Sequence, residues 1–331
     1  APVSIARAVV AMVGNPAANN GNGARANELV LGLLKQEGEQ YGFDVVDLTG
    51  SDYEDSMTRI QDRLSGIDGG FDGLVVVGGD GMVALGVNAL AGNPTPLGIV
   101  AMGSGNDFAR GLGLPVNRAQ AAVHGIAGAI VNGTHRDVDV GVISSSAATT
   151  DRLFAGMLSC GLDASINDRA NQSSLPYGKL RYFAAVLNEV RHIRNYGYHV
   201  RVVLEDGSVD ERDIASPLLT IANSRHVGGG IELSPNSLLD DGLLDLIWLN
   251  QVPTFTQIVH AISKAYTGGL LGTGLFDWQR VRSVDIGESP AGETPPVLMA
   301  DGECVGRMPV SVGVSARSMR LLVPPAVLSR S

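Results

Sequence analysis

The chain has 331 residues, a length that suggests two domains. Of these residues 44% are hydrophobic and 18% charged, proportions typical of a globular protein. Its formal net charge of −10 argues against nucleic-acid binding, because such binding requires basic side chains to neutralise phosphates. Two cysteines, Cys160 and Cys304, are too few for a disulfide framework or a structural zinc site. No apolar run is long enough to span a bilayer, and the first one ends at Asn15-Pro16, so the sequence predicts a cytoplasmic chain without a signal peptide.

Strand-like and helix-like segments alternate over the first part of the chain. The predicted strands are residues 6–13, 43–48, 73–77 and 96–102. The predicted helices are residues 24–42 and 53–66, a segment that follows Gly81, and residues 117–133. Near-continuous apolar strands separated by helices indicate an α/β domain with a parallel sheet and helices on both faces.

The pattern changes near Arg136, where short strand-like segments become dominant. They cover residues 136–144, 152–161, 199–214, 217–224, 242–250, 280–287 and 296–303. Asp206-Gly207 predicts a hairpin turn within the third of these segments. Two helices are expected among the strands, at residues 177–194 and 254–268. This half is therefore expected to be an antiparallel β-sandwich.

Two glycine-rich loops follow apolar strands in the first half. GGDG, residues 78–81, and GSGND, residues 103–107, each lie between a strand and a helix. A short crossover separates them, so their strands are expected to be parallel neighbours, with both loops at the carboxyl edge where α/β sheets bind ligands. Glycine amides at a helix start favour an anion such as phosphate. Asp80 and Asp107 would suit a site where a divalent cation or ordered water accompanies that anion. The alternative is that they form turns and helix caps.

These motifs together resemble the diacylglycerol kinase catalytic family, especially its bacterial soluble lipid kinases. The resemblance rests on GGDG, on GSGNDFAR and on a late DGE at residues 301–303, and it continues through residues 222–249 and 301–324. GGDG alone also occurs in NAD kinases and phosphofructokinases, whereas GxxxxGK[ST] is absent from the chain. The resemblance implies an ATP-binding domain at residues 1–135, joined by residues 313–331, a β-sandwich substrate domain at 136–312, and an active site in the cleft between them.

The resemblance also implies roles for individual residues. Together, the family resemblance and the two glycine-rich loops predict a set of nucleotide-binding residues: Asn15, Pro16, Thr49, Gly78, Gly79, Asp80, Gly81, Met82, Val83, Ala84, Ser104, Asn106 and Asp107. Asp241, with the carbonyls of Leu238 and Leu243, is implied to hold a Mg²⁺ that links loops of the two domains. The residues alone predict only a β-turn at Asp241-Gly242.

Asp301 and Glu303 are the implied catalytic acid/base pair. They follow an apolar strand, and in an extended segment residues two apart point the same way, so both carboxylates can face an acceptor hydroxyl. Which of the two is the base stays open, and an exposed hairpin tip is the alternative. Replacing either carboxylate with its amide is expected to lower turnover at least about a hundredfold.

Met82 stands where the family usually has threonine. A methionine cannot donate a hydrogen bond to phosphate, which is expected to cost on the order of 1 kcal/mol of binding. On this view Met82→Thr would tighten ATP binding modestly.

The sequence therefore predicts a Mg²⁺- and ATP-dependent lipid kinase, with diacylglycerol as the first candidate acceptor and phosphatidic acid as product. The rivals are an NAD kinase-like enzyme with a soluble acceptor and an inactive nucleotide-binding regulator. The enzyme is expected to act on lipid at the membrane surface, as a protein that binds the membrane transiently and peripherally. A homodimer is one of the oligomeric states that the sequence leaves open. The predicted helix at 177–194 either meets lipid headgroups through its basic side chains or packs on the sandwich.

Overall fold

The computed structural model describes residues 6–15, 22–67, 69–161, 164 and 193–328. The chain divides into two compact units, one of residues 1–138 with 318–331 and the other of residues 139–317. The chain passes from one unit to the other within β5 (His135–Ser144) and returns within β17 (Val310–Leu322). Pro16 and the helix predicted at 177–194 lie outside the described residues, apart from the last two positions of that helix.

The first unit is built on a parallel sheet. Its strands, in sheet order, are β2 (Phe43–Asp47), β1 (Ala8–Gly14), β3 (Gly73–Gly78), β4 (Leu97–Ala101) and the end of β17. Every residue of β4 is buried, as are all of β3 except Gly78, which explains their near-continuous apolar sequences. β3 pairs with both neighbours, Gly14 lying opposite Val77 and Gly78 opposite Ala101. The carboxyl ends of three adjacent strands therefore meet at one edge, as predicted.

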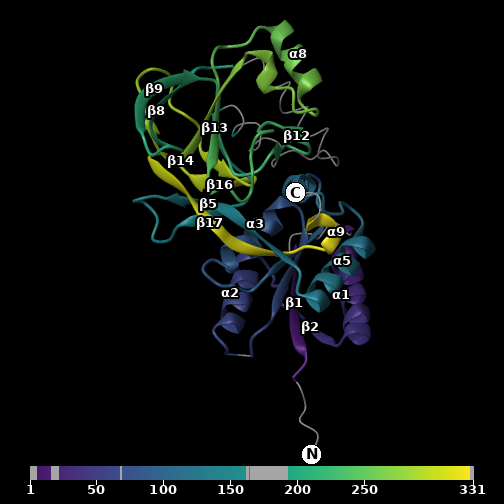
Figure 1. Cartoon of the computed structure of the whole chain (residues 1–331). Coiled ribbons are helices and arrows are strands. Elements are labelled where there is room, and N and C mark those ends of the chain that lie inside the picture. Colours follow the sequence, from purple (N-terminus) through teal and green to yellow (C-terminus); the bar gives the residue numbers. More distant parts are fainter. Residues whose placement is uncertain (1–5, 16–21, 68, 162–163, 165–192, 329–331) are drawn as a thin grey trace, which may run out of the picture. The chain divides into compact units, whose positions relative to one another are not determined.

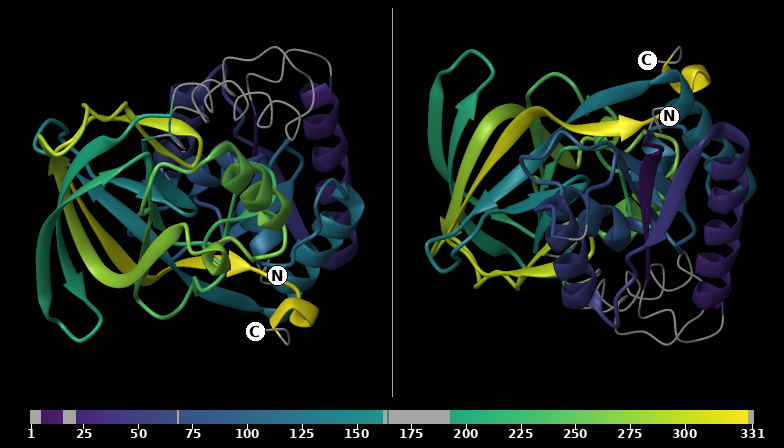
Figure 2. Two further views of the ribbon diagram at one scale, coloured as in Figure 1. Left: turned by 90° about the horizontal axis from the view of Figure 1, so that it is seen from above. Right: turned by 90° about the horizontal axis from the view of Figure 1, so that it is seen from below.

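Helices cover both faces of this sheet (Figures 1 and 2). The helices of this unit are α1 (Asn22–Tyr41), α2 (Tyr53–Leu64), α3 (Asp80–Ala89), α4 (Asp107–Gly111), α5 (Ala119–Asn132) and α9 (Pro325–Leu328). α1 and α5 lie side by side on one face, whereas α2 and α3 lie on the other. α3 begins at Asp80, two residues earlier than the sequence predicts, so this aspartate starts the helix instead of preceding it.

The second unit is dominated by antiparallel strands, as predicted. They are β6 (Arg152–Phe154), β7 (Met157–Gly161), β8 (Tyr196–Leu204), β9 (Val209–Ser216), β10 (Leu218–Ala222), β11 (His226–Val227), β12 (Ile231–Glu232), β13 (Leu244–Leu249), β14 (Phe276–Glu288), β15 (Leu298–Ala300) and β16 (Glu303–Gly306), with parts of β5 and β17. The long β14 pairs with β13, β17 and β8, and β8 continues to β9 through the predicted hairpin, where Gly207 has a φ of 85°. Buried aliphatic and aromatic residues such as Phe154 and Tyr198 form its main core.

Among the described residues, this unit also contains the helix α8 (Phe255–Lys264) and the short 3₁₀ turn η1 (Leu271–Thr273). α8 is shorter than the predicted 254–268. A second, smaller hydrophobic core contains residues such as Met157, Leu233 and Ile247. Residues of α8 and η1, namely Ala261 and Leu271, pack against it. Within the described ranges, no helix is long and apolar enough to cross a membrane.

Candidate active site

The two glycine-rich loops of the first unit pack directly on each other through their backbones. A Cβ atom added at Gly103 would lie 2.3 Å from the Cα of Gly79, a separation that no side chain tolerates. The amide of Met102 also donates a hydrogen bond to the carbonyl of Gly78, at 3.0 Å. The glycines are therefore required by loop-to-loop contact as well as by any ligand.

Asp80 ties these loops together with its side chain. Its two carboxylate oxygens accept hydrogen bonds from the amides of Asp107 and Phe108, both at 3.0 Å. Those amides belong to the first turn of α4, so Asp80, the first residue of α3, caps α4. Asn106 has a left-handed φ of 58°, and its side chain bonds the amide and carbonyl of Gly103 at 2.9 and 2.7 Å. The predicted residues Asp80, Asn106 and Asp107 are thus brought together, with the Asp80 carboxylate serving as a cap.

The first strand contributes to the same edge. The amide of Gly14 donates to the hydroxyl oxygen of Thr49 at 2.9 Å, which fixes Thr49 beside the end of β1. Asn15, the next residue, is exposed, as is Ser104 in the second loop. These three positions therefore lie where polar groups can reach a ligand at the carboxyl edge of the sheet.

The start of α3 offers main-chain rather than side-chain groups. Gly79 is the N-cap residue, and no side chain caps this helix. Met82, Val83 and Ala84 have only 6%, 3% and 1% of their surface exposed, so their side chains belong to the core. An uncapped helix start with glycines around it is a binding site for an anion such as phosphate.

Met82→Thr is therefore expected to reduce stability instead of improving ATP binding. A Cβ at Gly78 would lie 2.6 Å from the Cγ of Met82, which shows that the methionine fills the space beneath Gly78. Removing most of a buried methionine side chain costs about 2 kcal/mol or more of unfolding free energy. Urea denaturation and nucleotide titration of the variant check this: a tighter ATP complex at unchanged stability would mean that the threonine hydroxyl does reach the phosphates.

In the second unit, Asp301 and Gly302 form the tight turn of the β15–β16 hairpin. Both residues have positive φ, 51° and 81°, and Ala300 pairs with Glu303 across the turn. The premise that residues 301–303 are extended is therefore wrong, and alternation of faces does not align the two carboxylates. The hairpin-tip alternative describes the backbone correctly.

The Asp301 carboxylate is engaged at both oxygens. Oδ2 accepts from the amide of Ala155 at 2.8 Å and Oδ1 from the amide of Gly156 at 2.7 Å. Those amides belong to the turn between β6 and β7, so Asp301 fastens the hairpin to this neighbouring turn. Glu303, in contrast, is exposed at the start of β16. The two carboxylates thus differ in surroundings, one held by the protein and one open to solvent.

Asn223 supports the β6–β7 turn and was not singled out from the sequence. Its side-chain amide donates to the carbonyls of Asp139 and Ala155 at 2.9 and 2.8 Å, and its backbone amide bonds the carbonyl of Gly156 at 2.9 Å. In the described part of the chain, Asn223 Oδ1 and Ser224 Oγ are buried without a hydrogen-bond partner. Polar groups of the second unit thus gather around the Asp301 turn. The signal in the sequence was a polar pair directly after the apolar strand β10.

Asp241 lies in the loop before β13. Its Oδ1 accepts from the amide of Leu243 at 3.0 Å, as in the predicted turn. Burial raises the pKa of the Asp241 carboxyl above its usual value, and the nearby charges of Asp245 and Asp139 add to this against the opposing effect of Arg280. Leu238 is exposed and Leu243 is buried. A partly buried carboxylate beside two further carboxylates is a position where a cation would be stabilising.

Asp139 fixes this loop and was also missed from the sequence. It is fully buried, and its carboxylate accepts from the amides of Gly242 and Arg317 at 2.7 and 2.8 Å. Its own amide donates to the carbonyl of Leu239. An acidic residue between two buried valines in β5 was the available signal, because Val138 and Val140 flank it. No group of three or more His, Cys, Asp or Glu residues is arranged as a metal site among the described residues, so a cation at Asp241 would depend on main-chain carbonyls as well.

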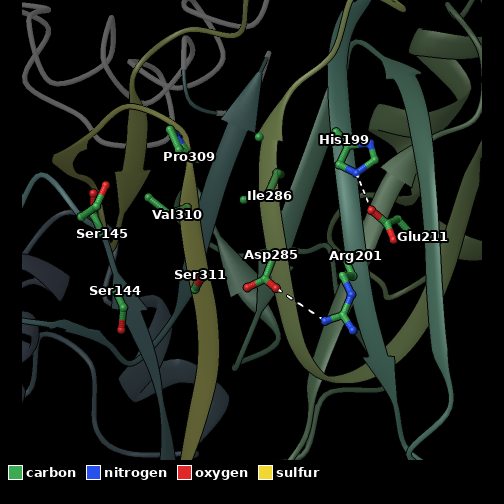
Figure 3. A pocket seen from close by; sticks show the side chains of 12 residues that line it. Ser144, Ser145, His199, Arg201, Glu211, Asp285, Ile286, Pro309, Val310 and Ser311 are labelled. Atoms are coloured by element: carbon green, nitrogen blue, oxygen red, sulfur yellow. Dashed lines mark hydrogen bonds and ion pairs between the residues drawn. The ribbon is translucent and has the colours of Figure 1, made fainter.

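A separate hollow of about 430 Å³ lies over β5, β8, β14 and β17 of the second unit (Figure 3). His199 contacts Glu211 at 2.9 Å and Asp213 at 2.7 Å, while Arg201 lies 3.9 Å from Asp285. The bonds to Asp213 and Glu211 raise the pKa of His199, so this ion pair strengthens as pH falls and is lost as pH rises through the raised pKa. None of the predicted site residues lines this hollow, and its charges are paired with one another.

Comparison with known proteins identifies both parts of the chain. Residues 9–143 match the diacylglycerol kinase catalytic domain, and residues 156–323 match the YegS C-terminal NAD kinase beta sandwich-like domain. The chain is 30% identical over 311 residues to a diacylglycerol kinase of Mycobacterium tuberculosis, with 94% of this chain and 93% of that protein covered. It is 26% identical over 257 residues to a diacylglycerol kinase of Bacillus subtilis, covering 77% and 78%.

Solved structures agree at the level of fold. The crystal structure of a diacylglycerol kinase from Bacillus anthracis superposes with a TM-score of 0.69 at 22% identity, covering 97% of this chain and 98% of that chain. The predicted α/β domain followed by a β-sandwich is therefore confirmed. With two matching domain models and a relative at 30% identity over nearly its whole length, the chain belongs to the diacylglycerol kinase family of lipid kinases.

Proposed function

We propose that this lipid kinase transfers the γ-phosphoryl group of ATP to a lipid hydroxyl, with diacylglycerol as acceptor and phosphatidic acid as product. The observation that carries the proposal is the backbone contact between Gly79 and Gly103, with Asp80 capping α4 across the loops. This contact builds a rigid, glycine-lined edge at the start of α3, which suits the phosphates of a nucleotide. The relatives named diacylglycerol kinase support the choice of acceptor.

The nucleotide is assigned to the first unit. Amides at the uncapped start of α3 would bind phosphate oxygens, and Thr49, Asn15 and Ser104 would add polar contacts at the same edge. Catalysis of phosphoryl transfer consists mostly of positioning the two substrates and neutralising charge. An edge held by the Gly79–Gly103 contact and by the Asp80 cap serves the first of these purposes.

Mg²⁺ fits the Asp241 loop of the second unit. The fit rests on the raised pKa of Asp241 and on the proximity of Asp139 and Asp245, because burial and repulsion that destabilise a carboxylate are relieved by a cation. Asp241, with the carbonyls of Leu238 and Leu243, would hold the ion. When bound, the ion would supply positive charge that stabilises this loop.

Asp241→Asn is expected to separate the metal effect from the fold. Without Mg²⁺ at neutral pH, the variant should melt at or above the temperature of the unmodified protein, since the raised pKa means that the charged carboxylate is unfavourable in the fold. The asparagine keeps an oxygen that can accept from Leu243. With Mg²⁺, only the unmodified protein should gain thermal stability. Because Mg²⁺ requires the charged carboxylate, its affinity should fall as pH falls through the raised pKa. Equal Mg²⁺-dependent stabilisation of both proteins would contradict the site.

Glu303 is the proposed general base and Asp301 a positioning residue. Both oxygens of Asp301 accept hydrogen bonds from main-chain amides, whereas Glu303 is exposed. A base must come within hydrogen-bond reach of the acceptor hydroxyl, which an exposed glutamate at a hairpin start can do. Asp301 would hold the hairpin that carries Glu303.

An acceptor panel tests the proposed function against its rivals. The protein is incubated with γ-labelled ATP and, in separate mixed micelles, diacylglycerol, monoacylglycerol, a sphingoid base or a glycolipid, with NAD as the soluble acceptor. Label in the diacylglycerol product is the expected result. Labelled NADP with no labelled lipid would establish the NAD kinase-like alternative, and ATP binding without transfer to any acceptor would establish the regulator.

A further inference from the structure

Helix α8 has an apolar face wider than the protein core requires. Ala261 and Ala265 lie on the side that meets the small core of the second unit. At 100° per residue, Phe255 and Val259 lie on a stripe offset from that side, and Tyr266 follows in the turn after the helix. These three side chains are 71%, 53% and 49% exposed. Figure 1 shows α8 at one end of the second unit.

The exposed apolar residues are concentrated here. Of the eleven large hydrophobic residues exposed in the described chain, four lie between positions 252 and 266, namely Val252, Phe255, Val259 and Tyr266. The remaining seven are distributed over other elements. These four residues are called the α8 patch below. A local concentration of exposed apolar side chains marks an interaction surface, whereas single exposed ones do not.

The charge around the α8 patch is unusual for this chain. The protein has 34 acidic residues among 331 and a net charge of −10, yet residues 246–276 contain no aspartate or glutamate. The same stretch contains Lys264 and His260. Among the described residues, two carboxylates contact this stretch, Glu232 of β12 beside Gly268 and Asp277, whose Oδ1 accepts from the side-chain amide of Asn250 at 3.4 Å. An acidic protein that approached an anionic bilayer would be repelled least along this stretch.

The helix does not depend on contacts of the α8 patch for its start. Thr254 and Gln257 form a reciprocal capping box, the Gln257 amide donating to Thr254 Oγ1 at 3.3 Å and the Thr254 amide to Gln257 Oε1 at 2.9 Å. Phe255, the first helical residue, follows the cap directly. Its ring is thus presented outward by a fixed backbone.

We infer that the α8 patch is the surface by which this protein docks on a lipid bilayer. An amphipathic helix with exposed aromatic and aliphatic side chains and no acidic residues has the composition of a helix that lies in the membrane interface. This inference rests on the proposed function, because an acceptor lipid embedded in a bilayer has to be reached from its surface. It adds the part of the chain that makes the contact.

Vesicle binding tests the inference directly. Flotation with vesicles of phosphatidylcholine and phosphatidylglycerol is expected to recover the unmodified protein, and Phe255→Gln with Val259→Gln should reduce bound protein at least about tenfold, since two apolar side chains no longer enter the interface. Leu29→Gln with Val131→Gln is the matched control. These residues are 52% and 51% exposed on α1 and α5, and their replacement should leave binding unchanged.

A second variant tests the role of charge. Thr256→Glu adds a carboxylate to the first turn of α8, where the helix dipole favours it, so the fold should not suffer. Binding to phosphatidylglycerol vesicles should weaken several-fold, whereas binding to pure phosphatidylcholine vesicles should change little. Equal loss on both kinds of vesicle would show that repulsion from anionic lipid is not involved.

Two outcomes would overturn the inference. One is vesicle binding by the Phe255/Val259 variant equal to that of the unmodified protein. The other is a dimer of the unmodified protein in sedimentation equilibrium that this variant dissociates, without vesicle binding by either, which would assign the α8 patch to a second copy of the chain. If no lipid is phosphorylated in the acceptor panel while vesicle binding still requires the α8 patch, the proposed function fails and the docking surface stands.

Discussion

Glu303→Gln is expected to lower turnover at least about a hundredfold, the usual effect of removing a general base. A lipid hydroxyl is a weak nucleophile, and the amide of glutamine cannot take its proton. Glu303 is exposed, and the described contacts of the fold do not depend on its charge. Thermal stability and ATP affinity should therefore stay close to those of the unmodified protein. Initial rates, a thermal melt and a nucleotide titration of the same preparation check all three expectations.

The matched control for this variant is Glu288→Gln, another exposed glutamate on a strand of the second unit. It should leave turnover unchanged. Turnover within a few-fold of the unmodified protein would remove Glu303 from the role of base.

Asp301→Asn is expected to reduce both stability and turnover. Aspartate accepts from two backbone amides, at 2.8 and 2.7 Å, whereas asparagine presents its own N–H₂ group to one of them. Losing one charge-assisted bond and leaving an amide unpaired costs about 2–3 kcal/mol of unfolding free energy. Asparagine tolerates the left-handed conformation at φ 51° as well as aspartate does, so the turn backbone is not itself disturbed.

Turnover of Asp301→Asn should fall about a hundredfold, because a small displacement of the hairpin misplaces Glu303. The readout that separates positioning from proton transfer is thermal stability, which should fall in this variant and stay unchanged in Glu303→Gln. Asp206→Asn, in the turn of the β8–β9 hairpin, is the control for a turn aspartate without this tie. Unchanged stability of Asp301→Asn would show that the two amide bonds contribute little.

The glycine-rich edge could be predicted because its signals are local. Apolar runs, glycine pairs and short crossovers are readable along the chain, and the predicted pairing of β3 with β4 is confirmed by a register that places Gly78 opposite Ala101. From the sequence, a capping role for Asp80 was one alternative to a role beside a ligand. The sequence could not decide between them, because the capping bonds join residues 27 and 28 positions apart. The side chain of Met82 was expected to face phosphate, but the first turn of α3 directs it into the core.

The candidate site of the second unit is built from hydrogen bonds between residues that lie far apart in the sequence. The bonds from Ala155 and Gly156 to Asp301 span 146 and 145 positions, and that from Arg317 to Asp139 spans 178. The spacing of apolar residues along the chain cannot predict which of these distant residues form hydrogen bonds. The turn at Asp301-Gly302 was readable as an Asp-Gly hairpin signal, yet the two carboxylates were placed on an extended segment, and the positive φ values correct that placement. The distinction between an anchored Asp301 and an exposed Glu303 therefore required the structure.

The most direct test of lipid phosphorylation by this chain is a single transfer experiment with paired proteins. Unmodified protein and Glu303→Gln are mixed with γ-labelled ATP, Mg²⁺ and diacylglycerol in mixed micelles, and the organic phase is extracted and counted over time. Labelled phosphatidic acid from the unmodified protein, at a rate at least about a hundredfold above that of the variant, is the predicted result. Label that stays in the aqueous phase, or equal rates for the two proteins, would contradict the proposed reaction or its proposed base.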